Sequence, residues 1–288
     1  MIPASFAYHR ATDLDDAIRL LGEHDGASLL AGGHSLIPMM KARLARPGAL
    51  IDIGRVEALR GIRDAGDAIR IGALTPHAEL QRSELVTEHA PLWAQAAHDL
   101  ADRQVRNRGT VGGNIAHADP ASDLPAVAVA TGATIHLAGP GGERAVPAGN
   151  FFVGLFTTGI RSGEVLTAIE VPKPAPRTGT CYEKFAHPAS GYAVVGAAVV
   201  VVLNEDGSCR EARLCFNGLT VSPLDATSVT DALAGGSLDD ATIAGAVDAH
   251  LSVDDPMGDV FASGPYRVEM AKVYGRRALQ KARDAARS

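Results

Sequence analysis

Cysteine is scarce in this sequence, and no motif would pair or cluster the cysteines that are present. Only three occur in 288 residues, Cys181, Cys209 and Cys215, and none belongs to a C-x-x-C pair. An odd and sparse set argues against a disulfide framework and fits a reducing compartment. It also cannot supply the thiolates of an ordinary iron–sulfur cluster, which uses Cys₄ ligation.

Long apolar runs and an excess of basic residues are also missing. The longest apolar stretch, residues 192–203, is too short to span a membrane. The N-terminal segment lacks the apolar core of a signal peptide, because acidic residues follow at once. The formal net charge of −6 disfavours nucleic acid as the main partner, since phosphate contacts need a basic face. We therefore expect a cytoplasmic protein, with association at the inner face of the membrane left open.

Motifs for hydrolysis, nucleotide hydrolysis and metal binding are absent as well. The sequence contains no G-x-S-x-G, no H-E-x-x-H, no glycine loop followed by G-K-[ST], and no G-x-G-x-x-G fingerprint. Its histidines are scattered, and most lone histidines are structural. We predict no metal site and no catalytic side chain in this chain, so any chemistry would come from a bound cofactor.

The N-terminal residues predict a small βαβ-like unit. A helix is expected over 12–24, with Thr12 or Asp13 as its N-cap, followed by a short buried strand over 27–32. A short helix capped by Ser35 and a second strand over 49–54 complete the unit.

A different pattern follows from about residue 54. A strand over 68–75 leads into a helix opened by Thr75, with Pro76 at its first position. Further helices are expected over 90–105 and 122–132, and further strands over 133–139 and 164–174. The proline-rich segment 172–180 is the best candidate for a linker.

Strands and helices of another composition lie beyond this linker. Three strands are expected over 181–187, 191–203 and 209–219, with a hairpin turn at 204–207. The chain ends in an amphipathic helix over 264–286. Val268, Ala271 and Ala278 line one side of this helix, and the basic residues Arg267, Lys272, Arg276, Arg277, Lys281 and Arg283 occupy much of the rest. This basic surface is either a solvated face or a docking surface for an acidic partner.

The segment from Ala31 to Ser35, A-G-G-H-S, places two glycines between a predicted strand and a predicted helix. Such a pair exposes consecutive backbone N–H groups at a helix N-terminus, which suits an anion such as a diphosphate. Gly32 and Gly33 leave the approach open, while His34 and Ser35 add hydrogen-bond donors.

A second segment, T-V-G-G-N from Thr110 to Asn114, repeats this arrangement about 80 positions later. Either segment alone could be an ordinary tight turn. Two together are better explained by one long ligand gripped at two points, and a dinucleotide has this length. Asp123 then follows either as an acceptor for a ribose hydroxyl or as a helix N-cap, whereas Asp119 favours a cap or turn role.

At these residues the sequence resembles the FAD-binding subunits of the molybdenum hydroxylases, and within them the carbon monoxide dehydrogenase type. The segments A-G-G-H-S-L-I-P-M-M-K and G-T-V-G-G-N-I-A-H-A-D-P carry the resemblance, which extends over essentially the whole chain. It implies an α+β fold, with a two-subdomain FAD-binding domain of the vanillyl-alcohol-oxidase type and a small C-terminal α+β domain with an antiparallel sheet. The implied division is residues 1–53 and 54–175 for the two FAD-binding subdomains, and 176–288 for the C-terminal domain.

The resemblance also implies which residues hold FAD. The two glycine segments would contact chiefly the diphosphate through Ala31, Gly32, Gly33, His34, Ser35, Leu36, Thr110, Val111, Gly112, Gly113 and Asn114. Asp123 matches an acidic residue at the adenosine ribose, and Leu166 matches a backbone contact. Lys184 and Tyr192 match residues beside the flavin ring. The family's G-D-Y-A reads S-G-Y-A here, so an aspartate that would bond locally is missing.

Such a subunit transfers electrons and does not itself attack the substrate. The resemblance implies a large molybdopterin-binding subunit and a small subunit with two [2Fe–2S] clusters, assembled as a dimer of heterotrimers. Electrons from the clusters would reach FAD and leave to a quinone or another acceptor. Carbon monoxide is the first expected substrate, with purines, N-heterocycles and aldehydes as alternatives. A self-sufficient flavin oxidoreductase and an assembly subunit that has lost its flavin are the competing hypotheses.

Overall fold

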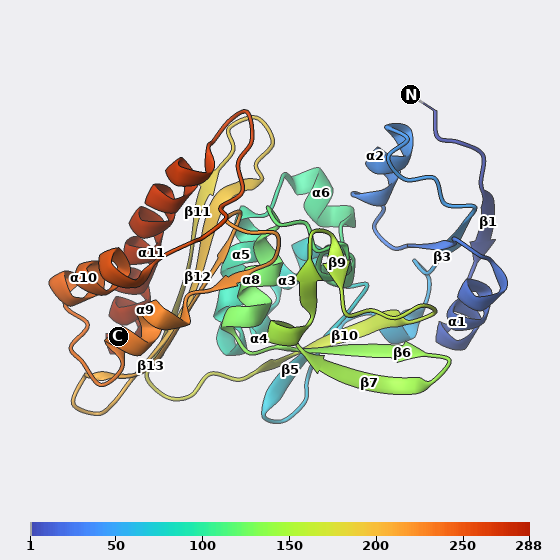
Figure 1. Cartoon of the computed structure of the whole chain (residues 1–288). Helices are drawn as coiled ribbons and strands as arrows, with labels where there is room; N and C mark the ends of the chain where they lie inside the picture. The colour runs from blue at the N-terminus through green and yellow to red at the C-terminus, as the bar shows by residue number, and fades with distance from the viewer. Residues whose placement is uncertain (1) are drawn as a thin grey trace.

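The computed structural model describes residues 2–288, and its three larger sheets follow one another along the chain (Figure 1). The N-terminal sheet has the order β1-β3-β2 and is parallel. Its elements are β1 (Ala7–Arg10), α1 (Leu14–Glu23), β2 (Ser28–Leu30), α2 (Leu36–Lys41) and β3 (Ala49–Asp52). The predicted βαβ unit is therefore confirmed, although β2 is only half-buried.

Two helix caps predicted in this unit have different outcomes. Asp13 caps α1, because its carboxylate accepts a hydrogen bond from the Asp16 N–H at 2.8 Å. Ser35 occupies the N-cap position of α2, but its backbone is already helical and its side chain makes no capping bond. The prediction of Ser35 as a capping side chain is therefore wrong.

The middle of the chain forms a five-stranded antiparallel sheet of order β4-β5-β10-β6-β7, packed against helices. Its strands are β4 (Ile62–Asp64), β5 (Ala68–Gly72), β6 (Thr134–Gly139), β7 (Gly142–Pro147) and β10 (Val165–Pro172), with a separate hairpin of β8 (Phe152–Gly154) and β9 (Thr157–Thr158). The helices are α3 (His77–Arg82), α4 (Glu84–His89), α5 (Pro91–Asp99), α6 (Arg103–Arg108), α7 (Val111–His117) and α8 (Asp123–Ala130), with short 3₁₀ turns η1 (Glu57–Leu59) and η2 (Ala148–Asn150). Trp93 and Phe151 are the largest side chains fully buried in this core.

Two helices predicted here are each divided in two by a local cap. The predicted helix from Thr75 begins instead at His77, with Pro76 at the N-cap position, and ends before Ser83. Ser83 is extended and caps α4 through a bond from the Val86 N–H. In the same way, Ala101 takes a left-handed conformation, and the Asp102 carboxylate accepts from the Val105 N–H to start α6. Local side-chain capping thus outweighs the continuous apolar pattern.

The C-terminal part is a four-stranded antiparallel sheet with helices on one face (Figure 1). Its elements are β11 (Thr178–Ala186), β12 (Ala193–Leu203), β13 (Cys209–Asn217), β14 (Leu224–Asp225), α9 (Thr227–Leu233), α10 (Asp240–His250) and α11 (Gly264–Arg287). The predicted hairpin turn is confirmed, and Gly207 adopts φ +84° there. Helix α11 packs so closely on β11 that a side chain at Gly179 would overlap the Ala282 carbonyl.

The described residues contain no disulfide and no helix suited to crossing a membrane. Cys181, Cys209 and Cys215 are all free and buried. Across residues 2–288, no helix is both long enough and apolar enough to span a bilayer.

Candidate functional site

The first glycine segment leaves a row of backbone donors unused. Among the described residues, the N–H groups of Gly33, His34 and Ser35 donate to no backbone or side-chain acceptor. Gly33 adopts φ +76°, a conformation that side chains rarely take. The His34 ring turns back to the Gly32 carbonyl, with Nδ1 and the oxygen 3.0 Å apart. Three consecutive free N–H groups in a loop form the kind of concavity that binds anions.

The two glycine segments lie against each other in space. A methyl group added to Gly32 would overlap the Arg108 carbonyl oxygen and come within 2.9 Å of the Gly109 Cα. A methyl group at Gly113 would lie 4.0 Å from Ala31 Cβ. The prediction that the two segments serve one site therefore has direct geometric support: they form one continuous surface.

The second segment differs from the prediction, because it is a helical turn and its amides are occupied. Thr110 is the N-cap of α7, and its Oγ1 accepts from the Gly113 N–H at 3.1 Å. The Val111 and Gly112 N–H groups donate to the carbonyls of Thr75 and Ala73. The interpretation of this segment as a second row of free N–H donors is thus wrong. Its glycines serve packing, since a methyl group on Gly112 would lie 2.5 Å from Ala73 Cβ.

The remaining surface of the second segment is small and partly polar. Gly113 is exposed and Asn114 is half-buried. The Asn114 side-chain oxygen accepts from Ser122 Oγ at 2.7 Å, which leaves the amide N–H₂ group of Asn114 as a donor. Leu166 is buried in β10 beside a register shift, and the next residue, Thr167, accepts a bond from the Ala73 N–H. Leu166 is therefore next to the residue that bonds Ala73, on which Gly112 packs.

Asp119 and Asp123 have separate roles. The Asp119 carboxylate accepts from the Ala121 N–H at 2.9 Å, so its predicted turn role is confirmed. Asp123 is the first residue of α8 and is buried, and Ser122 holds the N-cap position without a capping bond. The Asp123 carboxylate lies 2.9 Å from Lys184 Nζ and accepts a hydrogen bond from the Tyr182 hydroxyl at 2.6 Å. The structure thus brings together Asp123 and Lys184, two of the predicted site residues.

This buried cluster joins the middle of the chain to the C-terminal sheet. The Asp123 and Lys184 side chains are 5% and 4% exposed, so solvent hardly screens the pair. Burial raises the pKa of the Asp123 carboxyl, while the Lys184 charge and the Tyr182 hydroxyl oppose the rise. Burial and the neighbouring carboxylate together hold the pKa of Tyr182 well above its usual value. Lys184 also donates to the Asp99 carbonyl at 3.0 Å, at the end of α5.

Tyr192 lies apart from this cluster, on a hairpin tip between β11 and β12. Its side chain is 47% exposed. Burial of the remainder, reinforced by the Asp119 and Asp123 charges, raises the pKa of its hydroxyl. The tip is closed by the His187 N–H donating to the Tyr192 carbonyl at 2.8 Å. The Tyr192 N–H donates to Ser190 Oγ at 3.4 Å within this tip.

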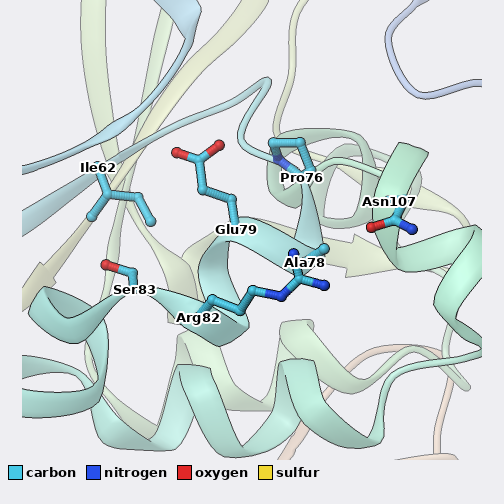
Figure 2. Close-up of a pocket in the computed structure, with 7 residues that line it drawn as sticks. All are labelled: Ile62, Pro76, Ala78, Glu79, Arg82, Ser83 and Asn107. Carbon is cyan, nitrogen blue, oxygen red and sulfur yellow. The ribbon is translucent and has the colours of Figure 1, made fainter.

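A cavity of about 540 Å³, whose lining Figure 2 shows, includes no residue of either glycine segment. It is lined by Ile62, Pro76, Ala78, Glu79, Arg82, Ser83 and Asn107. Pro76 forms an isolated β-bridge with Thr110, which places this cavity behind the second glycine segment. The described residues also contain no group of three or more histidine, cysteine or acidic side chains arranged for a metal ion.

The chain belongs to the FAD-binding subunits of the molybdopterin dehydrogenases. The family described as "FAD binding domain in molybdopterin dehydrogenase" matches residues 4–174. The family described as "CO dehydrogenase flavoprotein C-terminal domain" matches residues 180–282. Together the two matches span most of the chain.

Individual relatives are similar over almost their entire length. The carbon monoxide dehydrogenase medium chain of Hydrogenophaga pseudoflava is 40% identical, covering 98% of both chains. The solved structure of that organism's carbon monoxide dehydrogenase, in a form lacking the Mo-pyranopterin moiety, matches with TM-score 0.94 at 41% identity and 98% coverage of both chains. Quinoline 2-oxidoreductase from Pseudomonas putida 86 matches with TM-score 0.95 at 30% identity, covering all of both chains.

The residues present fit FAD at one point in particular. The free N–H groups of residues 33–35 belong to the segment whose Ala31 lies near Gly113, and a diphosphate is the part of FAD that such donors suit. Because α2 is only six residues long, the loop amides contribute more to this fit than the dipole of the helix.

Sequence reasoning missed the residues that support this site from behind. Tyr182 lies two positions before Lys184 in β11, and the two-residue period of a strand could have placed both on one face. His77 is 2% exposed, and its N–H donates to the Gly109 carbonyl. Nothing local in the sequence signals this contact, because it depends on how α3 meets α6.

Proposed function

We propose that this chain binds FAD across its two glycine segments and passes electrons through it. The proposed contacts are Ala31, Gly32, Gly33, His34, Ser35 and Leu36 from the first segment and Thr110, Val111, Gly112, Gly113 and Asn114 from the second. Asp123, Leu166, Lys184 and Tyr192 complete the proposed set. The three free N–H groups at residues 33–35 are the observation that supports this site most directly.

The proposed division of labour follows from where these residues lie. The loop at residues 33–35 would bind the diphosphate, and the half-exposed Tyr192 ring would lie beside the flavin ring. The buried ion pair of Lys184 and Asp123 would hold β11 against α8 beside this region. FAD, when bound, supplies the capacity to accept electrons one at a time and to hold two.

We infer the partners from the family. Its members are subunits of molybdenum hydroxylases, so a large molybdopterin-binding subunit and a small [2Fe–2S] subunit would supply the substrate chemistry and the electrons. A dimer of such heterotrimers, a quinone or another acceptor, and a cytoplasmic location, with the inner face of the membrane left open, complete the proposal. The chain would then divide at about residues 53 and 175 into two FAD-binding subdomains and a C-terminal domain.

Carbon monoxide is the proposed substrate of the complex, oxidised with water to carbon dioxide. The support is the 40% identity to a carbon monoxide dehydrogenase medium chain over 98% of both chains. An N-heterocycle is the second candidate, because the structure matches quinoline 2-oxidoreductase with TM-score 0.95. Purines and aldehydes are the remaining candidates.

A substrate panel on the purified complex tests this choice. The chain is tagged in its host, its complex is isolated, and reduction of an artificial dye is followed with carbon monoxide, quinoline, a purine and an aldehyde in turn. Turnover with carbon monoxide alone supports the proposal. Turnover with a heterocycle, a purine or an aldehyde and none with carbon monoxide refutes it. Turnover by the isolated chain would favour a self-sufficient oxidoreductase.

A further inference from the structure

Arg267 is a buried charge in a helix whose basic residues were expected to form either a solvated face or a docking surface. It lies near the start of α11 and is only 6% exposed. Its Nη1 donates to the Val194 carbonyl at 2.6 Å and to the Gly218 carbonyl at 2.9 Å. Its Nη2 pairs with the Asp259 carboxylate at 2.7 Å. One guanidinium therefore joins the start of β12, the end of β13 and the loop before α11.

The two carbonyls that Arg267 holds lie at the boundary with the glycine-rich part of the chain. Gly218 adopts φ +81°, and a side chain there would overlap the Val194 carbonyl. The Gly218 N–H donates to the Pro120 carbonyl at 2.8 Å, and the Ala193 N–H donates to the Ala121 carbonyl at 3.2 Å. Residues 120–122 are in turn linked to the second glycine segment, because the Asn114 side chain accepts a hydrogen bond from Ser122 Oγ. Arg267 thus fixes the strand ends that meet this loop.

The third partner of Arg267 reaches the hairpin tip from the other side. The Asp259 carboxylate accepts from the N–H groups of Phe261 and Ala262 at 2.9 and 2.8 Å, which forms a tight turn. The Phe261 ring packs on the His187 ring, with centroids 4.3 Å apart. In Figure 1 the loop before α11 runs beside the tip between β11 and β12. We call residues 187–194 and 259–262 together the lip.

We propose that Arg267 is a positioning residue for the flavin site, which holds the lip and thereby sets where the Tyr192 ring lies. This inference rests on the proposed placement of Tyr192 beside the flavin. On one side of Tyr192, Arg267 donates a hydrogen bond to the Val194 carbonyl. On the other side it pairs with Asp259, whose turn carries the Phe261 ring that packs on His187. It contacts neither glycine segment, so its removal alters the surroundings of the flavin ring and leaves diphosphate binding in place.

The test compares two arginines of the same helix in the intact complex. Arg267→Gln removes the charge and the bridge between the two carbonyls. The matched control is Arg283→Gln, because Arg283 also bonds a backbone carbonyl, Leu238 O at 2.8 Å, and carboxylates, Asp240 at 2.7 Å and Asp284 at 2.8 Å, away from the lip. The measurements are FAD content, the fluorescence yield of bound FAD, and the dissociation constant of FAD. Stacked aromatic rings quench flavin fluorescence, so this yield reports on Tyr192.

Arg267→Gln is expected to retain FAD and to change its fluorescence yield, while Arg283→Gln changes neither. In a Tyr192→Leu background, Arg267→Gln is expected to change the yield no further. The coupling between the two substitutions in the FAD dissociation constant should be at least about twofold, the lower end for residues of one network. An unchanged yield in Arg267→Gln, or fully additive effects with Tyr192→Leu, would overturn the inference.

Two further outcomes also decide the question: Arg267→Gln fails to fold, or the unaltered complex carries no FAD. If Arg267→Gln does not fold, Asp259→Asn takes its place, since an amide keeps the turn but loses the charge that pairs with Arg267. A smaller change of yield in the same direction supports the inference, and no change overturns it. If the unaltered complex carries no FAD, the proposed function fails and the inference fails with it; if FAD is present and indifferent to both variants, only the inference fails.

Discussion

At the scale of single residues, the glycines of the site are required for different reasons. Gly33 provides a left-handed conformation, Gly32 allows a carbonyl to approach, and Gly112 allows α7 to pack on Ala73. Only the left-handed conformation of Gly33 bears directly on the free N–H groups of residues 33–35. The sequence could predict that the glycines matter, but the pattern G-G is the same in both segments and could not separate anion binding from packing.

Gly32→Ala tests the contact between the two segments. The added methyl group overlaps the Arg108 carbonyl, and the backbone must shift, at a cost of about 1–3 kcal/mol. FAD content should fall strongly because the two segments separate. Gly22→Ala is the matched control, since nothing lies within 4 Å of the added methyl group and the site is exposed on α1. It should retain FAD and gain up to about 1 kcal/mol in the free energy of unfolding. Equal FAD content in both variants would contradict the role given to Gly32.

Lys184→Met tests the buried ion pair. It leaves the Asp123 carboxylate buried without its cation and should lower the free energy of unfolding by about 3–5 kcal/mol near neutral pH. In this variant burial holds the pKa of Asp123 above its unfolded value. The stability of the variant is then fully present below the pKa of Asp123 in the unfolded chain and is lost as pH rises through its pKa in the folded chain. The loss of stability relative to the unaltered chain should therefore shrink in acid. Denaturant unfolding at several pH values measures this, and a deficit that grows in acid would contradict it.

At the scale of elements, the second glycine segment is held in place by a neighbouring helix. His77 at the start of α3 donates its N–H to the Gly109 carbonyl, and the next residue, Thr110, caps α7. The His77 ring packs against Gly109, where an added methyl group would lie 3.0 Å from His77 Cδ2. Burial, aided by the positive charge of Arg106, lowers the pKa of His77 from 6.5 to about 4. His77 is therefore neutral near pH 7.

This shift predicts a dependence of stability on pH. Between pH 6.5 and about 4 the unfolded chain binds a proton at His77 that the folded chain does not. The free energy of unfolding should therefore fall by about 3 kcal/mol as pH drops through this window. His77→Gln should flatten the curve by this amount, whereas His98→Gln, which alters an exposed side chain, should leave it unchanged. Parallel curves for the unaltered chain and His77→Gln would contradict the account.

The elements also show why some predictions from sequence were confirmed and others were wrong. The helix at Asp13 and the hairpin turn at Gly207 are set by local signals, a capping side chain and a positive φ. The helices expected from Thr75 and over 90–105 were each divided, because Ser83 and Asp102 cap new helices within apolar patterns that look continuous. For the basic residues of α11 the sequence left a solvated face or a docking surface open. Arg267 is buried instead, because the Val194 and Gly218 carbonyls to which it donates come from distant parts of the chain.

At the scale of the whole molecule, the proposed site lies where three layers of the fold meet. The first glycine segment comes from the N-terminal sheet, the second from the middle of the chain, and Lys184 and Tyr192 from the C-terminal sheet. The seam is closed by the Asp123–Lys184 pair and by the bonds from Gly218 and Ala193 to residues 120 and 121. Sequence patterns predict the layers one by one. They do not show which side chains face each other across a seam.

The central claim is that this chain carries FAD within a molybdenum hydroxylase that oxidises carbon monoxide. The most direct test is to isolate the complex through a tag on this chain and to record its visible spectrum without oxygen, before and after carbon monoxide is added. The account predicts flavin and iron–sulfur absorption, larger and smaller partner chains, and bleaching of the flavin band by carbon monoxide. A complex without flavin absorption, or one bleached by quinoline or a purine and untouched by carbon monoxide, would contradict it.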